Sequence, residues 1–282
     1  MAATYKPTLV LGGTGKTGRR VVERLTARGL PARVGSRSGE PAFDWEDRST
    51  WAPALNGMGA VYLTYYPDLS GPGAAEATHA FADLAVHSGV SRLVLLSGRG
   101  EPQAERAEQA VRDTGAELTV LRATWFMQNF DEDYMREHVL SGEIRLPAGD
   151  VPTPFVDAED IADIAVAALT DDRHVGKLYE LTGPRSLTMA EAAAEIAAAA
   201  GRDVRYVPIS IAQHESEARE HGVPPDVVEI LTYLFEEVLD GRNADTTDDV
   251  QRALGRAPRD FADYARAAAA TRVWDRRPDL AA

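Results

Sequence analysis

A glycine-rich run near the start of the chain carries the strongest chemical signal in the sequence. The run from Gly12 to Gly18 reads GGTGKTG; it follows an apolar segment, 8–11, and precedes a segment, 19–28, with apolar residues at helical spacing. Strand, glycine turn and helix in this order open a dinucleotide-binding unit. Glycines at 12, 15 and 18 let the backbone turn tightly, approach a pyrophosphate and pack the helix close to the strand. The N–H groups at the helix N-terminus would then face the phosphates.

Two other interpretations of the glycine run are simpler or more specific. The same sequence pattern is also compatible with a glycine turn that only links a strand to a helix. A phosphate-binding P-loop needs a glycine five positions before Gly15, where the chain has Val10, so that loop is excluded. We predict a dinucleotide site whose first residues are Gly12, Thr14, Gly15, Lys16, Thr17 and Gly18.

The residues after the second predicted strand, 32–35, favour one cofactor over another. Ser36, Arg37 and Ser38 follow that strand directly. An NAD site usually has Asp or Glu here to bind the ribose 2′-hydroxyl. A guanidinium between two hydroxyls suits a 2′-phosphate instead, and none of the three residues is a carboxylate that would repel it. We therefore predict NADP(H) as the cofactor, with an ordinary surface arginine as the alternative for Arg37.

Composition excludes several function classes. The chain has 282 residues and a formal net charge of −14, which argues against a nucleic-acid surface. It has no cysteine, and its 6 histidines show no metal-ligand spacing, so we expect no disulfide and no metal. No apolar run approaches the roughly 18 residues of a membrane span, and residues 1–7 lack the features of a signal peptide. We expect a cytoplasmic protein with a small-molecule substrate and no membrane or direct nucleic-acid partner; a homodimer is compatible with the sequence.

Strands and helices alternate along the first 160 residues. The predicted strands are 8–11, 32–35, 60–64, 92–96 and 118–121, with a further one at 178–181. This alternation predicts an α/β fold, a Rossmann-type doubly wound parallel sheet, with a smaller, mainly helical C-terminal substrate lobe. We place the NADP-binding domain at residues 1–150. The lobe at 151–282 would contribute a sheet edge and the substrate pocket, the two forming a single compact unit.

Ligands of such sheets bind beyond the carboxyl ends of the strands. Ser97 ends the fourth predicted strand, while Thr64, Tyr65 and Tyr66 end or follow the third. We predict that Thr64, Tyr65 and Ser97 contact the cofactor, that Asp44 contacts the adenine edge, and that Tyr66 contacts substrate. A capping, packing or turn role is the simpler alternative for these residues.

Several further segments resemble a known family. They are 119–122 (TVLR), 125–130 (WFMQNF), 155–162 (FVDAEDIA) and 181–184 (LTGP). Together with the glycine run, they resemble the short-chain dehydrogenase/reductase superfamily in its atypical NmrA-like branch, over nearly the whole chain. Residues 43–45 (FDW) and 50–55 (TWAPAL) are similar to ergot alkaloid reductases of the festuclavine dehydrogenase type. The resemblance implies either an NAD(P)H-dependent reductase of quinones, azo dyes or imines, or a redox-sensing regulator that binds NADP.

The sequence departs from the superfamily at its usual catalytic pair. Typical members reduce carbonyls with Tyr-x-x-x-Lys, in which the tyrosine protonates the forming alkoxide. No tyrosine of this chain has a lysine four residues later. Where the pair is expected, the chain has Arg106, which could hold the ribose but cannot exchange a proton at neutral pH.

Two functions are compatible with this departure. An iminium carbon already carries positive charge, and a quinone delocalises the oxyanion that hydride transfer produces, so neither acceptor needs a strong proton donor. We predict an NADPH-dependent oxidoreductase that transfers hydride to such a small conjugated or cyclic acceptor, an imine, iminium or quinone-like intermediate of secondary metabolism. The alternative is a non-catalytic NADP(H)-sensing, NmrA-like regulator that acts through a protein partner.

The remaining candidates for chemistry lie mostly after the fifth predicted strand. Ser97, Tyr134 and His138 are the candidate proton donors. The acidic residues 131–133 would favour a cationic substrate, or else form a solvated helix face. The side chains predicted to form an apolar wall for a flat ligand are Trp125, Phe126, Met127 and Phe130, for which ordinary core packing is the alternative.

Overall fold

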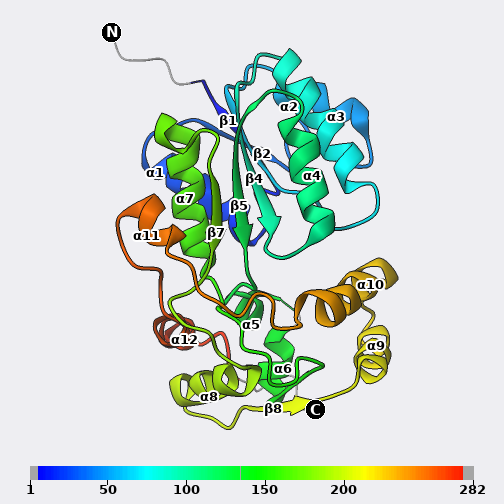
Figure 1. The fold of residues 1–282 in the computed structure, drawn as a ribbon, viewed down its shortest axis with the longest axis vertical. Helices are drawn as coiled ribbons and strands as arrows, with labels where there is room; N and C mark the ends of the chain where they lie inside the picture. The colour runs from blue at the N-terminus through cyan, green and yellow to red at the C-terminus, as the bar shows by residue number, and fades with distance from the viewer. Residues whose placement is uncertain (1–5, 134, 276–282) are drawn as a thin grey trace. The chain divides into compact units, whose positions relative to one another are not determined.

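Six parallel strands form one sheet, and the helices that connect them lie on its two faces (Figure 1). In spatial order the strands are β2 (Ala32–Gly35), β1 (Thr8–Leu11), β3 (Ala60–Leu63), β4 (Arg92–Gly98), β5 (Glu117–Ala123) and β7 (Leu178–Leu181). All residues of β1 and β3 are buried, as expected for short apolar strands covered on both faces. The predicted Rossmann-type fold is confirmed.

The helices of the sheet divide between its faces. One face carries α1 (Lys16–Ala27), α7 (Ala158–Thr170) and α11 (Asp249–Leu254), and the other carries α2 (Trp51–Leu55), α3 (Ala74–His87) and α4 (Pro102–Arg112) (Figure 1). Short 3₁₀ turns lie at Arg48–Thr50 and Asp172–His174. The strand order reverses direction between β1 and β3, since β2 lies on one side of β1 and β3 on the other. Open α/β sheets bind ligands at such a reversal, outside the carboxyl ends of the strands.

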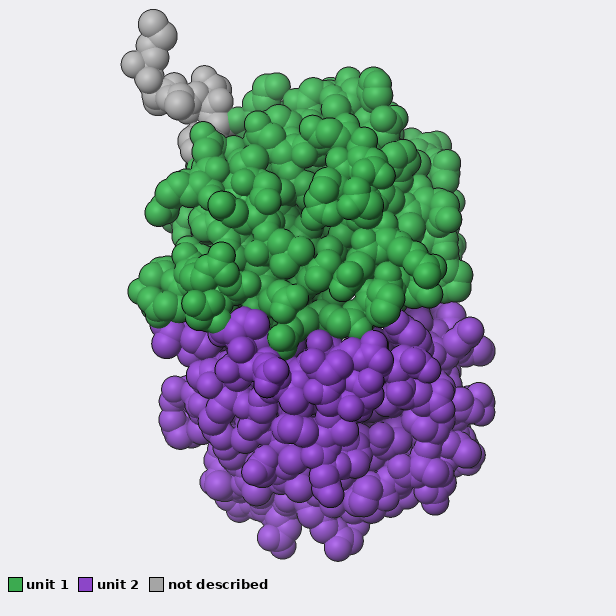
Figure 2. Space-filling view, in the orientation of Figure 1, with its two compact units in different colours: residues 1–123, 158–181, 248–256 green, residues 124–157, 182–247, 257–282 purple. Residues whose placement is uncertain are grey.

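The computed structural model describes residues 6–133 and 135–275, and the chain divides into two compact units (Figure 2). Unit 1, residues 1–123, 158–181 and 248–256, contains the six-stranded sheet; unit 2 comprises residues 124–157, 182–247 and 257–282. The predicted boundary at residue 150 and the expected single compact unit do not coincide with this division. The chain leaves unit 1 directly after β5 and then returns, because β7 pairs with β5 to complete the sheet.

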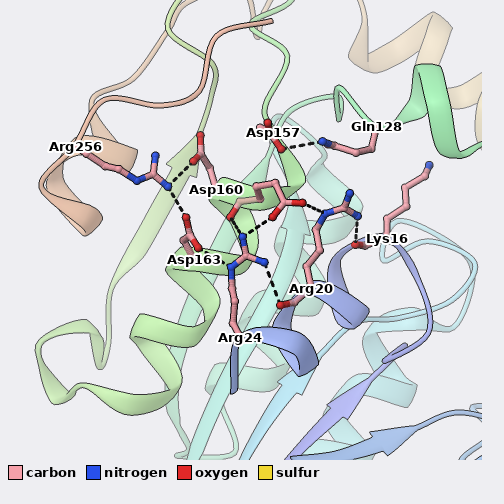
Figure 3. A network of polar contacts seen from close by, with 9 residues as sticks. Lys16, Arg20, Arg24, Gln128, Asp157, Asp160, Asp163 and Arg256 are labelled. Atoms are coloured by element: carbon pink, nitrogen blue, oxygen red, sulfur yellow. Dashed lines mark hydrogen bonds and ion pairs between the residues drawn. The ribbon is translucent and has the colours of Figure 1, made fainter. Parts of the chain in front are cut away.

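An ion network joins α1 to α7 within unit 1 (Figure 3). Arg20 Nε lies 2.5 Å from Glu159 Oε1, and Arg24 contacts Glu159 at 2.5 Å and Asp163 at 2.6 Å. Arg256, which follows α11, contacts Asp163 at 2.5 Å. Arg256 also contacts Asp160 at 2.7 Å, so three arginines and three carboxylates hold together three segments that are distant in sequence.

Unit 2 is mainly helical, as predicted for the C-terminal lobe. A two-stranded parallel sheet pairs β6 (Glu143–Leu146) with β8 (Arg205–Pro208). The helices are α5 (Asn129–Glu132), α6 (Met135–Ser141), α8 (Met189–Ala200), α9 (Ile211–Glu220), α10 (Pro225–Tyr233) and α12 (Phe261–Ala270), with a π-helical turn at Leu234–Val238. Phe130, Phe155 and Phe261 lie at the centre of its core, with ring centroids 5.5 or 5.6 Å apart. In the described part of the chain, no helix is long and apolar enough to cross a membrane.

Candidate active site

Close packing requires glycine at two positions of the loop between β1 and α1. Gly12 has a φ of 59°, in the left-handed region that favours glycine. A Cβ on Gly18 would lie 2.1 Å from the Gly12 carbonyl oxygen, so only glycine lets α1 approach the end of β1 this closely. Gly15 differs: it is exposed, and a Cβ there would meet only the Gly12 oxygen, at 3.2 Å. The fold therefore needs Gly12 and Gly18, whereas Gly15 leaves bare backbone that a ligand can approach.

The first turn of α1 is arranged to receive an anion. Gly15 stands at the N-cap position, where no side chain caps the helix, and no acidic residue lies in the first turn. Helices α8 and α9 begin instead with complete capping boxes. The partial positive charge and backbone N–H groups of such an uncapped start suit a phosphate. Thr14 is exposed beside it and Lys16 half-buried, whereas the buried Thr17 offers a ligand only its backbone.

The glycine loop lies where β1 and β3 end side by side. Val10 of β1 is opposite Tyr62 of β3 in the register. Thr64, just beyond β3, donates its hydroxyl to the Leu11 carbonyl oxygen at 3.1 Å, and a Cβ on Gly12 would lie 2.7 Å from that hydroxyl. Thr64 therefore fixes the path of the loop, while its predicted contact with the cofactor stays a prediction.

The carboxyl end of β2 presents a cation beside this loop. Gly35, the last residue of β2, is opposite Leu11, so Ser36, Arg37 and Ser38 continue from the same edge of the sheet. Arg37 is exposed, and among the described residues its guanidinium makes no hydrogen bond or ion pair. The hydroxyls of Ser36 and Ser38 lie 3.4 Å apart. The predicted 2′-phosphate group would thus meet an accessible arginine between two hydroxyls.

An aromatic cluster supports the segment after β2 and the end of β3. The ring centroids of Trp45 and Tyr65 lie 4.9 Å apart, and burial is the first cause of a raised pKa for Tyr65. The Asp44 carboxylate accepts a hydrogen bond from the backbone N–H of Glu46 at 3.0 Å. Tyr65 and Asp44 thus have the packing and turn roles that were their alternatives, and their contacts with a cofactor stay predictions. Tyr66 is 66% exposed, in keeping with a surface that receives substrate.

Ser97, at the end of β4, is engaged in a buried polar network. It is 5% exposed and donates its hydroxyl to Glu108 at 2.6 Å. The same carboxylate accepts two hydrogen bonds from Arg122 of β5, each 2.8 Å. This Ser–Glu–Arg network lies where the superfamily would have its Tyr-x-x-x-Lys helix. The hydroxyl proton of Ser97 is therefore directed at Glu108, which does not support the prediction that Ser97 is the proton donor.

A buried carboxyl pair at the same edge of the sheet was missed by the sequence analysis. Glu101, only 8% exposed, accepts a hydrogen bond from the Ser70 hydroxyl, and Asp68 accepts one from the Ser70 backbone N–H at 2.7 Å. Burial, reinforced by the Asp68 charge, raises the pKa of Glu101 to about 8, and burial also raises the pKa of Asp68. Glu101 therefore carries a proton at neutral pH. No spacing rule marks this pair, because only folding brings the loop after β3 against the start of α4.

Unit 2 contains the remaining candidates, and its structure divides the predicted apolar wall. Met127 and Phe130 are 1% and 0% exposed and belong to the core of unit 2. The wall is corrected accordingly: packing on all sides leaves these two side chains no surface for a ligand. Trp125 and Phe126 are partly exposed, and their contact with a ligand stays a prediction.

The two other predicted proton donors have different outcomes. His138 is half-buried, its Nδ1 accepts a hydrogen bond from the Arg145 backbone N–H at 3.2 Å, and burial lowers its pKa. Its imidazole is therefore neutral at neutral pH and is not poised as an acid. Tyr134 lies outside the described residues. Among the residues that the structure does describe, no group of three or more side chains is placed to hold a metal ion.

The fold and the glycine loop define a dinucleotide-binding protein of the Rossmann class. The chain belongs to the NmrA-like family, whose model matches residues 104–272, and an NAD(P)H-binding model matches residues 12–172.

Individual relatives agree with this assignment. The uncharacterized oxidoreductase YesF of Bacillus subtilis is 36% identical over 95% of this chain and 98% of its own, and festuclavine dehydrogenase of Aspergillus fumigatus is 32% identical over 91% and 96%. The crystal structure of the triphenylmethane reductase of Citrobacter sp. complexed with NADP(H) is similar with a TM-score of 0.75 and 22% identity, over 93% of this chain and 99% of that one. The predicted family is confirmed, and the class is that of the NAD(P)H-dependent oxidoreductases.

The contrast between Gly15 and Gly18 gives a test of the loop. Gly15→Ala is expected to fold normally but to bind NADP(H) about tenfold more weakly or worse, because its methyl group would cover the exposed backbone of the loop. Gly18→Ala is expected to lower the Tm instead, because α1 must move away from β1. Calorimetric titration and thermal unfolding of both variants measure the two effects. Unchanged NADP(H) affinity in Gly15→Ala would show that this loop is not the site.

Glu101→Gln is expected to stabilise the protein at alkaline pH. Folding raises the pKa of Glu101 from 4.5 to about 8, so between these values the folded state binds more protons than the unfolded state. The contribution of this group to stability therefore falls as the pH rises through that range, by on the order of a few kcal/mol, and an amide removes the effect.

Denaturant unfolding near pH 6 and near pH 9 measures this difference, with the exposed Glu23→Gln as the control. The stability gained by Glu101→Gln should be larger at the higher pH. A gain that is the same at both values would mean that Glu101 is ionised in the folded protein.

Proposed function

We propose that this chain is an NADPH-dependent reductase that transfers hydride to a small conjugated or cyclic acceptor of the imine, iminium or quinone class. The observation that carries the proposal is the meeting, at one edge of one sheet, of the uncapped glycine loop and the accessible Arg37. Neither feature serves the fold: the sheet does not need a cation at the end of β2, and α1 does not need glycine at position 15.

The choice of NADPH over NADH rests on charge. Neighbouring strands lie about 4.8 Å apart. The residues after Gly35 are therefore close enough to the residues after Leu11 for one bound dinucleotide to contact both. Arg37 can form charge-assisted hydrogen bonds with a 2′-phosphate, which are roughly twice as strong as neutral ones. Ser36 and Ser38 add neutral donors on either side.

The acceptor class rests on the proton inventory at the ends of the strands. When bound, the nicotinamide supplies the hydride, and the protein contributes binding, orientation and exclusion of water. Ser97 donates to Glu108, and no tyrosine–lysine pair exists to protonate an alkoxide. The protonated Glu101 is buried and hydrogen-bonded to Ser70, so it does not present its proton to a ligand. A site without such a donor suits an acceptor that delocalises the negative charge gained with the hydride, or one that loses a positive charge on reduction. The similarity to a festuclavine dehydrogenase supports a cyclic acceptor of secondary metabolism.

Oxidation of NADPH with a panel of acceptors tests the function. The purified protein should consume NADPH in the presence of simple quinones or cyclic imines and should leave unconjugated ketones unreduced, because only the former need no strong acid. Reduction of simple ketones would overturn the acceptor class. Binding of NADPH and NADP⁺ without turnover of any acceptor would favour the non-catalytic NADP(H)-sensing regulator instead.

Arg37→Asp tests the cofactor. The substitution sets a carboxylate against the 2′-phosphate, so the Kd for NADPH should rise about 10- to 100-fold while the Kd for NADH changes little. Arg28→Asp is the control, because Arg28 is also exposed but follows the opposite end of α1. Equal loss of affinity for NADPH and NADH in Arg37→Asp would contradict the assignment.

A further inference from the structure

The loop between β3 and α3 presents an aromatic ring to solvent at the ligand-binding edge of the sheet. Among the described residues, Tyr66 is the one large apolar side chain that is exposed, at 66%. It lies just beyond β3, at the reversal of strand order where open α/β sheets bind ligands. Single exposed apolar residues are common on protein surfaces, so exposure by itself assigns Tyr66 no role. The contacts that hold its loop in place are more informative.

The chain is fixed on both sides of Tyr66. On one side, the Thr64 hydroxyl donates to the Leu11 carbonyl oxygen at 3.1 Å, and Trp45 Nε1 donates to the Thr64 carbonyl oxygen at 3.2 Å. On the other side, Leu69 is 6% exposed and packs in the core of unit 1. An exposed ring on a loop that is already ordered loses little freedom when a ligand stacks on it.

Ser70 then ties the loop to a carboxyl from a different segment. Its hydroxyl donates to Glu101, and its backbone N–H donates to Asp68 at 2.7 Å. Glu101 stands at the N-cap position of α4, yet its side chain does not cap that helix. A Cβ on Gly98 would lie 1.9 Å from Glu101 Oε1, so the carboxyl packs against bare backbone at the end of β4. Glu101 thus joins the loops that follow β3 and β4.

The contact between Ser70 and Glu101 requires a neutral carboxyl. The charged groups that face Glu101 are Asp68, from the loop after β3, and Glu108, from α4. Glu108 is paired with Arg122, whereas neither Asp68 nor Glu101 makes an ion pair with any cation among the described residues. A second negative charge buried beside Asp68 is unfavourable. Ionisation would therefore drive the Glu101 carboxyl towards solvent and release the loop.

We propose that Glu101 is a positioning residue for acceptor binding: its neutral carboxyl holds Ser70 and thereby keeps Tyr66 where the ring stacks on a flat acceptor. Tyr66 contacts the ligand, whereas Glu101 acts only through the loop. The ligand chemistry that suits an exposed ring is a planar conjugated system such as a naphthoquinone. The inference deepens the proposed reductase function and rests on it for the identity of the ligand as an acceptor.

The pH profile of KM tests the role of Glu101. The pKa of Glu101 is about 8, so the carboxyl loses its proton between about pH 7 and about pH 9. Over this range the KM of the wild type for 2-methyl-1,4-naphthoquinone should rise about fivefold. Glu101→Gln keeps an oxygen for the Ser70 hydroxyl and cannot ionise, so its KM should stay low. The kcat and the Kd for NADPH of the two proteins should agree within about twofold at each pH.

Two matched variants complete this experiment. Glu23→Gln makes the same chemical change at an exposed position of α1 and should follow the wild-type profile. Gly98→Ala introduces a methyl group where the Glu101 carboxyl lies, and it should raise the KM already near pH 7. A KM that rises as steeply in Glu101→Gln as in the wild type would overturn the positioning role. If Glu101→Gln does not fold, a wild-type KM in Gly98→Ala would overturn it instead.

The ring of Tyr66 is tested at an exposed position, where substitution leaves the core intact. Tyr66→Ala should raise the KM for the same quinone about tenfold, at neutral and at alkaline pH. Tyr66→Phe keeps the ring and should stay within about twofold of the wild type. Equal KM values in Tyr66→Ala and Tyr66→Phe would overturn stacking by this residue.

Direct binding separates this inference from the reductase proposal. Titration of 2-methyl-1,4-naphthoquinone into protein saturated with NADP⁺ measures acceptor binding without turnover, and the chain has no cysteine that would add to the quinone. Binding that Tyr66→Ala weakens, in a protein that oxidises no NADPH with any acceptor, would support the stacking role and reject the reductase function. Turnover that Tyr66→Ala leaves unchanged would reject the inference alone. Failure of the wild type to bind the quinone would overturn the stated ligand class.

Discussion

The close approach of α1 to the end of β1 is the constraint on which the rest of unit 1 depends. The approach is possible because Gly18 has no Cβ. A Cβ at this position would lie 2.1 Å from the Gly12 carbonyl oxygen. That approach brings the uncapped start of α1 to the reversal of strand order between β1 and β3. The ion pairs of Arg20 and Arg24 with α7 then hold the helix in this position from its other side (Figure 3). The uncapped helix start at this edge, which suits a phosphate, is thus a consequence of packing, with Gly15 as the one glycine of the three that the packing does not demand.

The ends of β4 and β5 show how a familiar catalytic arrangement is replaced. Ser97 is retained, but its partner is Glu108, and Arg122 neutralises that carboxylate across the strand pair. A buried carboxylate with a bidentate arginine holds α4 against the sheet and accepts the hydrogen bond of the Ser97 hydroxyl. Glu101 does carry a proton, because burial and the charge of Asp68 raise its pKa. This arrangement is the basis on which we propose hydride acceptors that need orientation and little acid catalysis.

Local sequence rules succeeded where one segment contains both the cause and the effect. The strand-forming apolar runs and the glycine spacing belong to short stretches of chain, and the structure places the strands and the loop as predicted. The rules failed at residues whose environment comes from elsewhere. Met127 and Phe130 have the composition of a ligand wall, yet Phe155 and Phe261 from distant segments enclose Phe130 in a core. The composition of unit 1 also depends on a distant segment, since β7 returns to pair with β5.

By itself, the sequence determined the Rossmann-type class, the family and the position of the glycine loop, because hydrophobic periodicity and glycine geometry act over a few residues. Only the tertiary structure decided which polar side chains are available for chemistry. Burial and partners far along the chain tie the Ser97 hydroxyl to Glu108, keep Glu101 protonated and join it to Ser70. The physical reason is that hydrogen bonding and the free energy of ionisation depend on the surroundings in space, and those surroundings are assembled from segments that no local pattern connects.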